Sequence, residues 1–246
     1  MNLGGRTFAV GIALIATAAV AHEARAQART AETIFADFVR ASGGESAWKQ
    51  HRSLSMRMRL EIRGMALSGT ASALWTSKGQ YLETGEIPNM LTTKRGGSGK
   101  RFWSYDPIDG LRWLQGSEAE QMAITSAWKS YVRLPSMAVS TKVVAPLAEG
   151  MECVELSFKN SPATTACFDK QSHLLSLESG KKVSPQGETP YRTHLSDYRA
   201  VNGIMFPFVQ ETTAGPATFV VTVDEVTWDV PAPAKLFALP KPPKSK

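Results

Sequence analysis

Two consecutive runs of alternating apolar and polar residues, 54–62 and 65–75, predict a β-hairpin early in the chain. The apolar positions of the first run are Leu54, Met56, Met58, Leu60 and Ile62. If Arg63 and Gly64 form a two-residue turn, Met58 lies opposite Gly69, and the apolar residues of both runs share one face. One side of the hairpin is therefore predicted to be wet and the other apolar.

The apolar face of this hairpin sets large, flexible side chains against very small ones. Methionine adapts to irregular shapes, and glycine or alanine opposite it leaves space, so the face suits either a covering helix or a hydrophobic ligand. The candidates for an apolar groove are Met56, Met58, Leu60, Leu67, Gly69, Ala71 and Trp75. Ordinary core packing under a helix is the alternative interpretation.

Helix signals occur before and after this hairpin. Thr30 is expected to cap a helix that ends at Gly43-Gly44, and a short helical segment is expected at 45–50. Later in the chain, Ser117 and Glu120 have the spacing of a capping box, which predicts a second long helix.

Three residues of that later helix, Met122, Trp128 and Tyr131, are predicted to share an apolar side. Met122 and Trp128 therefore join the groove candidates, on a helix that would cover the sheet. The remaining strands are predicted at 80–84, 91–94, 101–105, 111–114, near 142, and at 153–158, 164–168, 173–178, 193–201, 204–212 and 218–226. The segment 180–190 is predicted to be a polar loop.

The chain begins with the pattern of a secretory signal. Arg6 ends a short positive region, an apolar stretch follows, and Ala26-Gln27-Ala28 offers a cleavage site. We expect a signal peptide at 1–28, one domain at 29–240 and a flexible basic Pro/Lys tail at 241–246. The apolar stretch is short for a membrane span, and an uncleaved anchor is the alternative. The expected compartment is a bacterial periplasm.

The overall charge is only mildly basic, with 28 Lys and Arg against 22 Asp and Glu. That balance and the absence of aromatic RNA-binding signatures argue against a nucleic-acid partner. The densest basic cluster, at 94–101, is interpreted as solvated loop charge, with contact to an anionic envelope membrane surface as the alternative.

Two cysteines, Cys153 and Cys167, lie in alternating runs joined by the turn residues 159–162. A hairpin centred on Asn160 places them directly opposite each other, at a separation that a disulfide bond can span. Export to an oxidising compartment favours a structural disulfide. A redox role would usually need Cys-x-x-Cys, and a zinc site would need further ligands nearby.

The sequence carries no catalytic signature. Its four histidines lack the His-Glu-x-x-His spacing of zinc peptidases, and the glycine-rich segment at 96–99 fits neither a nucleophile elbow nor a phosphate-binding loop. Asp106 and Asp109 are interpreted as turn residues. We therefore expect a protein that is not an enzyme and needs no cofactor or metal.

Several motifs together resemble the LolA-like superfamily of periplasmic lipoprotein-sorting and lipid-carrier proteins. The resemblance covers the mature chain and rests on segments 41–44, 53–75, 102–107, 167–170 and 235–240, and most specifically on Asp197-Tyr198, Val201, Gly203-Ile204 and Pro207. It implies an α+β, mainly β fold: an antiparallel, unclosed half-barrel whose helices cover an apolar concave face that takes acyl chains.

The resemblance implies a non-catalytic periplasmic carrier or chaperone, which binds a lipid or the acyl chains of a lipid-modified protein in a hydrophobic groove. Outer-membrane lipoprotein sorting is one form of that function. The alternative is an envelope sensor or scaffold that recognises a protein partner through the groove or a sheet edge. A closed and fully packed structural domain is a third interpretation.

Overall fold

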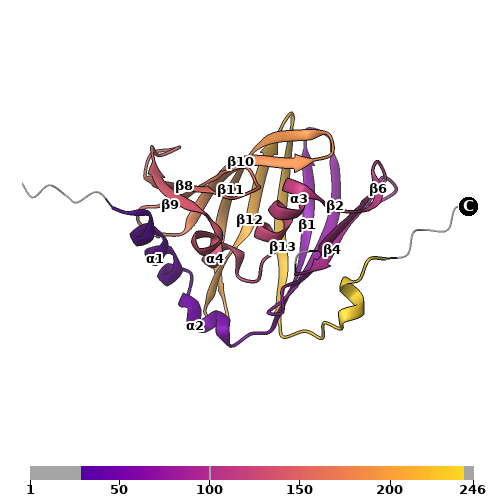
Figure 1. Cartoon of the computed structure of the whole chain (residues 1–246), viewed down its shortest axis with the longest axis horizontal. Coiled ribbons are helices and arrows are strands. Elements are labelled where there is room, and N and C mark those ends of the chain that lie inside the picture. Colours follow the sequence, from indigo (N-terminus) through magenta and orange to yellow (C-terminus); the bar gives the residue numbers. More distant parts are fainter. Residues whose placement is uncertain (1–28, 100, 241–246) are drawn as a thin grey trace, which may run out of the picture.

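The fold is built on one antiparallel sheet of thirteen strands, in the order β6-β5-β4-β3-β2-β1-β13-β12-β11-β10-β9-β8-β7. The computed structural model describes residues 29–99 and 101–240. The predicted signal peptide and basic tail lie outside these residues. The sheet curves but does not close, because β6 and β7 remain at its two edges, and the helices lie across one face (Figure 1). The predicted mainly β, unclosed half-barrel is confirmed.

Most strands follow one another as simple hairpins. Their bounds are β1 Ser53–Arg63, β2 Leu67–Thr76, β3 Gln80–Ile87, β4 Leu91–Ser98, β5 Arg101–Asp106, β6 Gly110–Trp113, β7 Ser140–Val144, β8 Met151–Ser157, β9 Thr164–Asp169, β10 Leu175–Ser184, β11 Gly187–Val201, β12 Ile204–Ala214 and β13 Ala217–Trp228. The central pairing of β1 with β13 joins the two halves of the chain.

The helices are α1 Ala31–Ala41, α2 Gly44–Lys49, α3 Gly116–Thr125 and α4 Ser130–Met137, with a short 3-10 helix η1 at Ala234–Phe237. Thr30 caps α1 as predicted, because its hydroxyl accepts a 3.3 Å hydrogen bond from the backbone N–H of Thr33. The end of α1 packs tightly on the β11–β12 turn: a Cβ added to Gly43 would lie 2.0 Å from the carbonyl oxygen of Gly203. Segment 41–44 and the segment around Gly203, on which the family resemblance rests, are therefore in contact.

The first hairpin has the predicted faces in a different register. Met58 pairs with Ala71, not with Gly69, and Ile62 pairs with Leu67. The prediction of a two-residue turn was wrong, since residues 63–66 form a longer connection with positive φ at Gly64 and Ala66. A shift of two residues keeps every side chain on its face.

The predicted helix from Ser117 through Trp128 is wrong in two respects. Gln115 occupies the N-cap position without a side-chain capping bond, so the capping box does not form. The helix also ends at Thr125, where the Ser126 hydroxyl donates to the Met122 carbonyl, and the chain restarts as α4 after Lys129, whose φ is 61°. Trp128 lies in the connection, and the side chain of Tyr131 lies outside the described part.

The segment 180–190 is not a loop, contrary to its polar composition. β10 runs to Ser184 and β11 starts at Gly187, so both strands extend through a tight connection at Pro185 and Gln186. Polar side chains are accommodated because this stretch borders a cavity on one side and solvent on the other.

The core lies between the helices and the concave face of the sheet, in three buried clusters. One is formed by α1 against β8, β9 and β10, with Phe35 and Phe38 packed on Phe168. The second is aromatic and includes Trp48 and Trp128. The third lies under α3.

The predicted disulfide between Cys153 and Cys167 is present, with the two residues paired directly across β8 and β9 and their Cα atoms 4.0 Å apart. Both side chains are fully buried in a small separate cluster with Leu177, Val144 and Met151.

Candidate functional site

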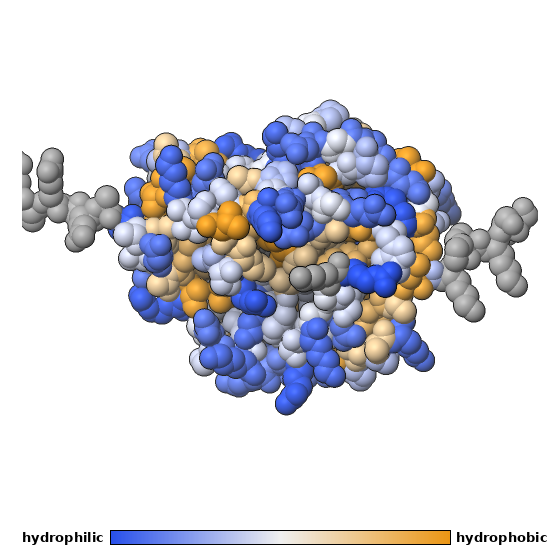
Figure 2. Space-filling model, viewed as in Figure 1, coloured by the Kyte–Doolittle hydropathy of each residue, from blue (hydrophilic) through white to orange (hydrophobic). Residues whose placement is uncertain are grey.

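A cavity of about 550 Å³ lies in the middle of the half-barrel, between the β3–β6 and the β10–β12 parts of the sheet. We call these parts the two arms. Helices α3 and α4 form its cover, and it extends to the β5–β6 and β10–β11 turns, where Ile108 and Pro185 contribute to its lining. The volume falls within the range of about 300–1,000 Å³ that is typical of small-molecule sites. Figure 2 shows apolar surface in the middle of the helix-bearing face, with hydrophilic surface around it.

Part of the cavity wall is apolar. These side chains come from the helices, from β11 and from the ends of β6 and β8: Leu114, Met122, Ile124, Leu134, Phe158 and Leu195. Leu134 and Leu195 belong to the α1 cluster and Leu114 to the cluster under α3, so the wall is a continuation of the packed core. Such a wall can hold a hydrocarbon chain.

The β3–β6 part of the wall is polar. Glu83 pairs with Arg95, Arg95 with Ser104, and Ser104 with Arg112, so these four side chains form one row across four strands. All four line the cavity. Neighbouring strands place paired residues on the same face, which explains why the row points inward as a unit.

The other arm contributes a second charged group, Glu178, Lys182 and Tyr191 on β10 and β11. The Tyr191 hydroxyl donates to the Glu178 carboxyl over 2.5 Å, and the Lys182 ammonium lies 5.4 Å from the centre of the Tyr191 ring. Burial raises the pKa of Glu178. Lys182 is accessible to solvent, but it lines the concave cavity, where its ammonium is partly desolvated. This desolvation is the main cause that lowers the pKa of the Lys182 ammonium, and the positive charge of Arg95 is the second.

Tyr81 on β3 is buried beside the row and donates a hydrogen bond to Glu83. Burial raises the pKa of the Tyr81 phenol well above its ordinary value, and the Glu83 charge raises it further. Tyr81 therefore stays protonated and remains a donor to Glu83.

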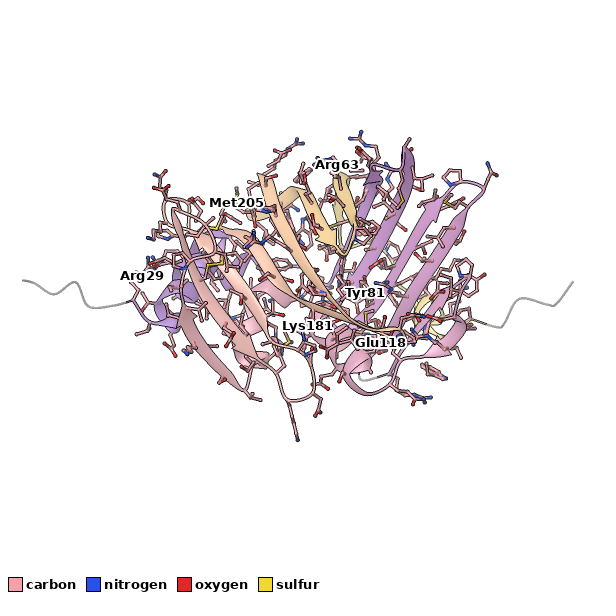
Figure 3. The ribbon with its side chains drawn as sticks, turned by 90° about the horizontal axis from the view of Figure 1, so that it is seen from above. Arg29, Arg63, Tyr81, Glu118, Lys181 and Met205 are labelled. Atoms are coloured by element: carbon pink, nitrogen blue, oxygen red, sulfur yellow. A yellow bond between two sulfur atoms is a disulfide. The ribbon has the colours of Figure 1, made fainter. Side chains whose placement is uncertain are left out.

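Helix α3 is tied to both arms. Its Glu118 forms a two-pronged ion pair with Arg112 of β6, over 2.6 and 2.7 Å. Its Gln121 binds the backbone of β10. Figure 3 labels Tyr81 on β3, Glu118 on α3 and Lys181 on β10, and the three labels lie in one region of that view. The Lys181 carbonyl accepts the bond from Gln121. A further bond of 3.0 Å joins Gln186 to Asp109 at the turns.

The predicted groove residues occupy different surroundings. Of the nine, Met122 lines the cavity. Met56, Met58 and Trp75 pack against the buried clusters, and Trp128 is buried within the aromatic one, 5.9 Å from Trp48. The others, Leu60, Leu67, Gly69 and Ala71, are half-buried on the hairpin. Ligand binding by these nine residues stays a prediction.

The sequence interpretation missed the charged residues of the cavity. Arg95 was assigned to a solvated loop, yet it lies on β4 and lines the cavity, while its neighbour Lys94 does not. Glu83 shares strand parity with the buried Tyr81, and this alternation is a signal that could have revealed it. Lys182 escapes prediction because its polar surroundings at 180–190 are typical of a loop, whereas the structure places it on β10. Glu178 lies at the end of the predicted strand 173–178, but nothing in that strand's pattern marks it as a cavity residue.

Asp106 has the turn role that the sequence predicted for it. Its carboxylate accepts 2.8 Å bonds from the backbone N–H groups of Ile108 and Asp109. Within residues 29–99 and 101–240, no group of three or more His, Cys, Asp or Glu side chains is placed to hold a metal ion. In the same residues, no helix is long and apolar enough to cross a membrane.

Comparisons with known proteins find similar solved structures. No protein-family model matches the chain, and no curated protein matches its sequence. A LolA superfamily protein from Nitrosomonas europaea superposes with a TM-score of 0.54 at 11% identity, over 86% of this chain and 98% of that one.

Two further solved structures agree. A DUF1329 family protein from Desulfovibrio piger gives a TM-score of 0.54 at 12% identity, over 84% of this chain and 96% of that one. A putative outer membrane lipoprotein-sorting protein domain from Vibrio parahaemolyticus gives 0.52 at 9% identity, over 83% and 94%. The thirteen-stranded open sheet with helices across its concave face is thus the LolA-like fold.

Proposed function

We propose that this protein is a non-catalytic carrier that binds a lipid, or the lipid part of a modified protein, in the cavity between the two arms. The observation that carries the proposal is the cavity itself, which has the size of a ligand site and combines an apolar wall with a charged one. Such a division suits an amphipathic molecule, with its hydrocarbon against Met122 and Leu195 and its polar end against the row.

The driving force is burial of the hydrocarbon. Each methylene removed from water contributes roughly 0.8 kcal/mol, so an acyl chain gains enough to offset the cost of immobilising it. Nothing in this function needs a nucleophile, a metal or a cofactor. The named lipoprotein-sorting neighbour has the same fold and supports the proposal by analogy. Export by the N-terminal signal to the periplasm is part of the same proposal.

Two adjacent threonines on β4 allow a direct test. Thr93 lines the cavity opposite Gly85, whereas Thr92 pairs with Glu86 and lies outside the lining. Thr93→Trp fills space inside, and Thr92→Trp adds the same side chain outside. Binding of a fluorescent long-chain fatty acid should be at least about tenfold weaker for the first variant and unchanged for the second.

Circular dichroism and unfolding curves are measured for both variants to establish that each is folded. Equal binding by wild type and Thr93→Trp would contradict the proposed site. Failure of the wild type to bind any long-chain amphiphile would contradict the carrier function and favour the protein-recognition module.

A further inference from the structure

We propose that the cavity binds its amphiphile by an anionic head group, a phosphate or carboxylate, held between Arg95 on one arm and Lys182 on the other, with the Ser104 hydroxyl as a further donor. This inference rests on the proposed carrier function and specifies the chemistry of its ligand. It derives from the balance of donors and acceptors around the cavity.

The β3–β6 arm presents donors that lack acceptors. The Ser104 side chain is only 6% exposed, lines the cavity, and has no hydrogen-bond partner within residues 29–99 and 101–240. The Nε atom of Arg112, next in the row, is also buried without a partner there. A buried polar group without a partner is destabilising, so an acceptor placed beside these donors is favoured.

The two cations are not neutralised by ion pairs. Neither Arg95 nor Lys182 forms a salt bridge with a carboxylate in the described part of the chain. They line the same cavity from opposite arms and repel each other, and this repulsion contributes to the lowered pKa of Lys182. An anion between them relieves the repulsion, and it gains two charge-assisted hydrogen bonds.

The acids of the cavity already have donors, which disfavours a cationic ligand. Glu83 accepts from Tyr81 and Glu178 from Tyr191. The remaining lining carboxylates are also engaged: Glu118 by Arg112, Asp109 by Gln186, and Asp106 by backbone N–H groups. Each lining carboxylate therefore accepts at least one hydrogen bond, whereas the Ser104 hydroxyl and the Arg112 Nε have no partner within residues 29–99 and 101–240. An acceptor-rich anion supplies what these two donors lack.

The chain offers a charge-matched control. Lys94 and Lys181 directly precede Arg95 and Lys182 on the same strands, and neither belongs to the cavity lining. The double variants Arg95→Gln/Lys182→Gln and Lys94→Gln/Lys181→Gln each remove two positive charges. Comparing them separates the effect of the cavity cations from that of net charge.

The probes are oleoyl lysophosphatidic acid, 1-oleoylglycerol and inorganic phosphate, measured by titration calorimetry against the full mature protein. The first two share a hydrocarbon chain and differ by the phosphate. We expect wild type and Lys94→Gln/Lys181→Gln to bind the lysophosphatidic acid at least about tenfold more tightly than the glycerol ester. Arg95→Gln/Lys182→Gln should lose that preference while still binding the ester.

Equal affinity of the wild type for the two lipids would overturn the inference and leave the carrier function standing. Loss of the preference in both double variants would assign it to overall charge, which also overturns it. Inorganic phosphate is expected to bind far more weakly than the lipid. Equally tight binding of phosphate alone would show a free-anion site and refute a lipid head group.

Discussion

The side-chain amide of Gln121 on α3 accepts a 3.0 Å hydrogen bond from the backbone N–H of Val183 on β10. Its nitrogen donates over 2.7 Å to the carbonyl of Lys181. β9 pairs with β10 only as far as Ser179, so this part of the β10 edge has no strand beside it. Gln121 therefore completes the edge and anchors the cover of the cavity.

Replacing Gln121 with alanine should loosen α3. The substitution leaves two backbone groups of β10 without their partner, which costs about 1–3 kcal/mol in the free energy of unfolding. Hydrogen exchange measured by mass spectrometry should rise in residues 116–125 and 181–183. The exposed Gln115→Ala is the control. Unchanged exchange in α3 would show that other contacts hold the cover.

Glu178 gives a pH dependence with a defined sign. Burial raises the pKa of its carboxyl above the ordinary value of 4.5, so the folded protein binds a proton that the unfolded chain has released just above that pH. The contribution of this carboxyl to the free energy of unfolding is therefore largest below pH 4.5 and decreases as the pH rises above that value.

Glu178→Gln removes this titration and keeps an acceptor for Tyr191. Its stability relative to wild type should increase as the pH is raised from 4.5 to neutrality, measured by urea unfolding at several pH values. A constant difference between Glu178→Gln and wild type would contradict the assignment.

Two glycines on neighbouring strands should respond differently to alanine. A Cβ at Gly69 would lie 2.0 Å from the backbone oxygen of Glu86, whereas one at Gly85 would meet only the Thr93 hydroxyl, at 2.9 Å. A side chain can rotate away more easily than a paired strand can shift. Gly69→Ala should therefore cost about 1–3 kcal/mol in the free energy of unfolding, and Gly85→Ala less, in the same urea assay.

Substitutions of Gly69 are therefore a poor test of ligand binding, because any side chain at this position disturbs the pairing of β2 with β3. If Gly69→Ala unfolds at the same urea concentration as wild type, the close approach of the two strands is not a constraint. Binding tests are better placed at Thr93.

The disulfide should contribute to stability and not to binding. It closes a hairpin with a sequence separation of 14, for which loop closure predicts about 3 kcal/mol. Its cluster is separate from the cavity lining. Cys153→Ala/Cys167→Ala should lower the midpoint of urea unfolding and leave fatty-acid affinity unchanged in a folded sample. A large loss of affinity would connect this cluster to the site.

The sequence predicted the fold class well where local patterning determines structure. Alternation located the first hairpin and both of its faces, and the turn at Asn160 placed Cys153 opposite Cys167. The hairpin register was wrong because a two-residue and a longer turn preserve the same faces, and the residues around Gly64 do not distinguish them.

The charged cavity was harder to predict because its members lie on distant strands. Arg95 and Lys182 line one cavity only because the sheet bends. In the sequence, polar residues that face a cavity have the same pattern as residues that face solvent. For Trp128 the sequence predicted a position on the helix that covers the groove, but its side chain is buried with Trp48 and Trp228. Large indoles fill core space whenever the chain allows it.

The most direct test of the carrier function is native mass spectrometry of the protein exported to a bacterial periplasm and purified without detergent. The account predicts a stoichiometric adduct of lipid mass on wild type and Thr92→Trp, absent from Thr93→Trp and lost on denaturation. A solvent extract would identify that lipid and its head group. A clean apo mass for all three proteins, together with no uptake of added long-chain amphiphiles, would contradict the account.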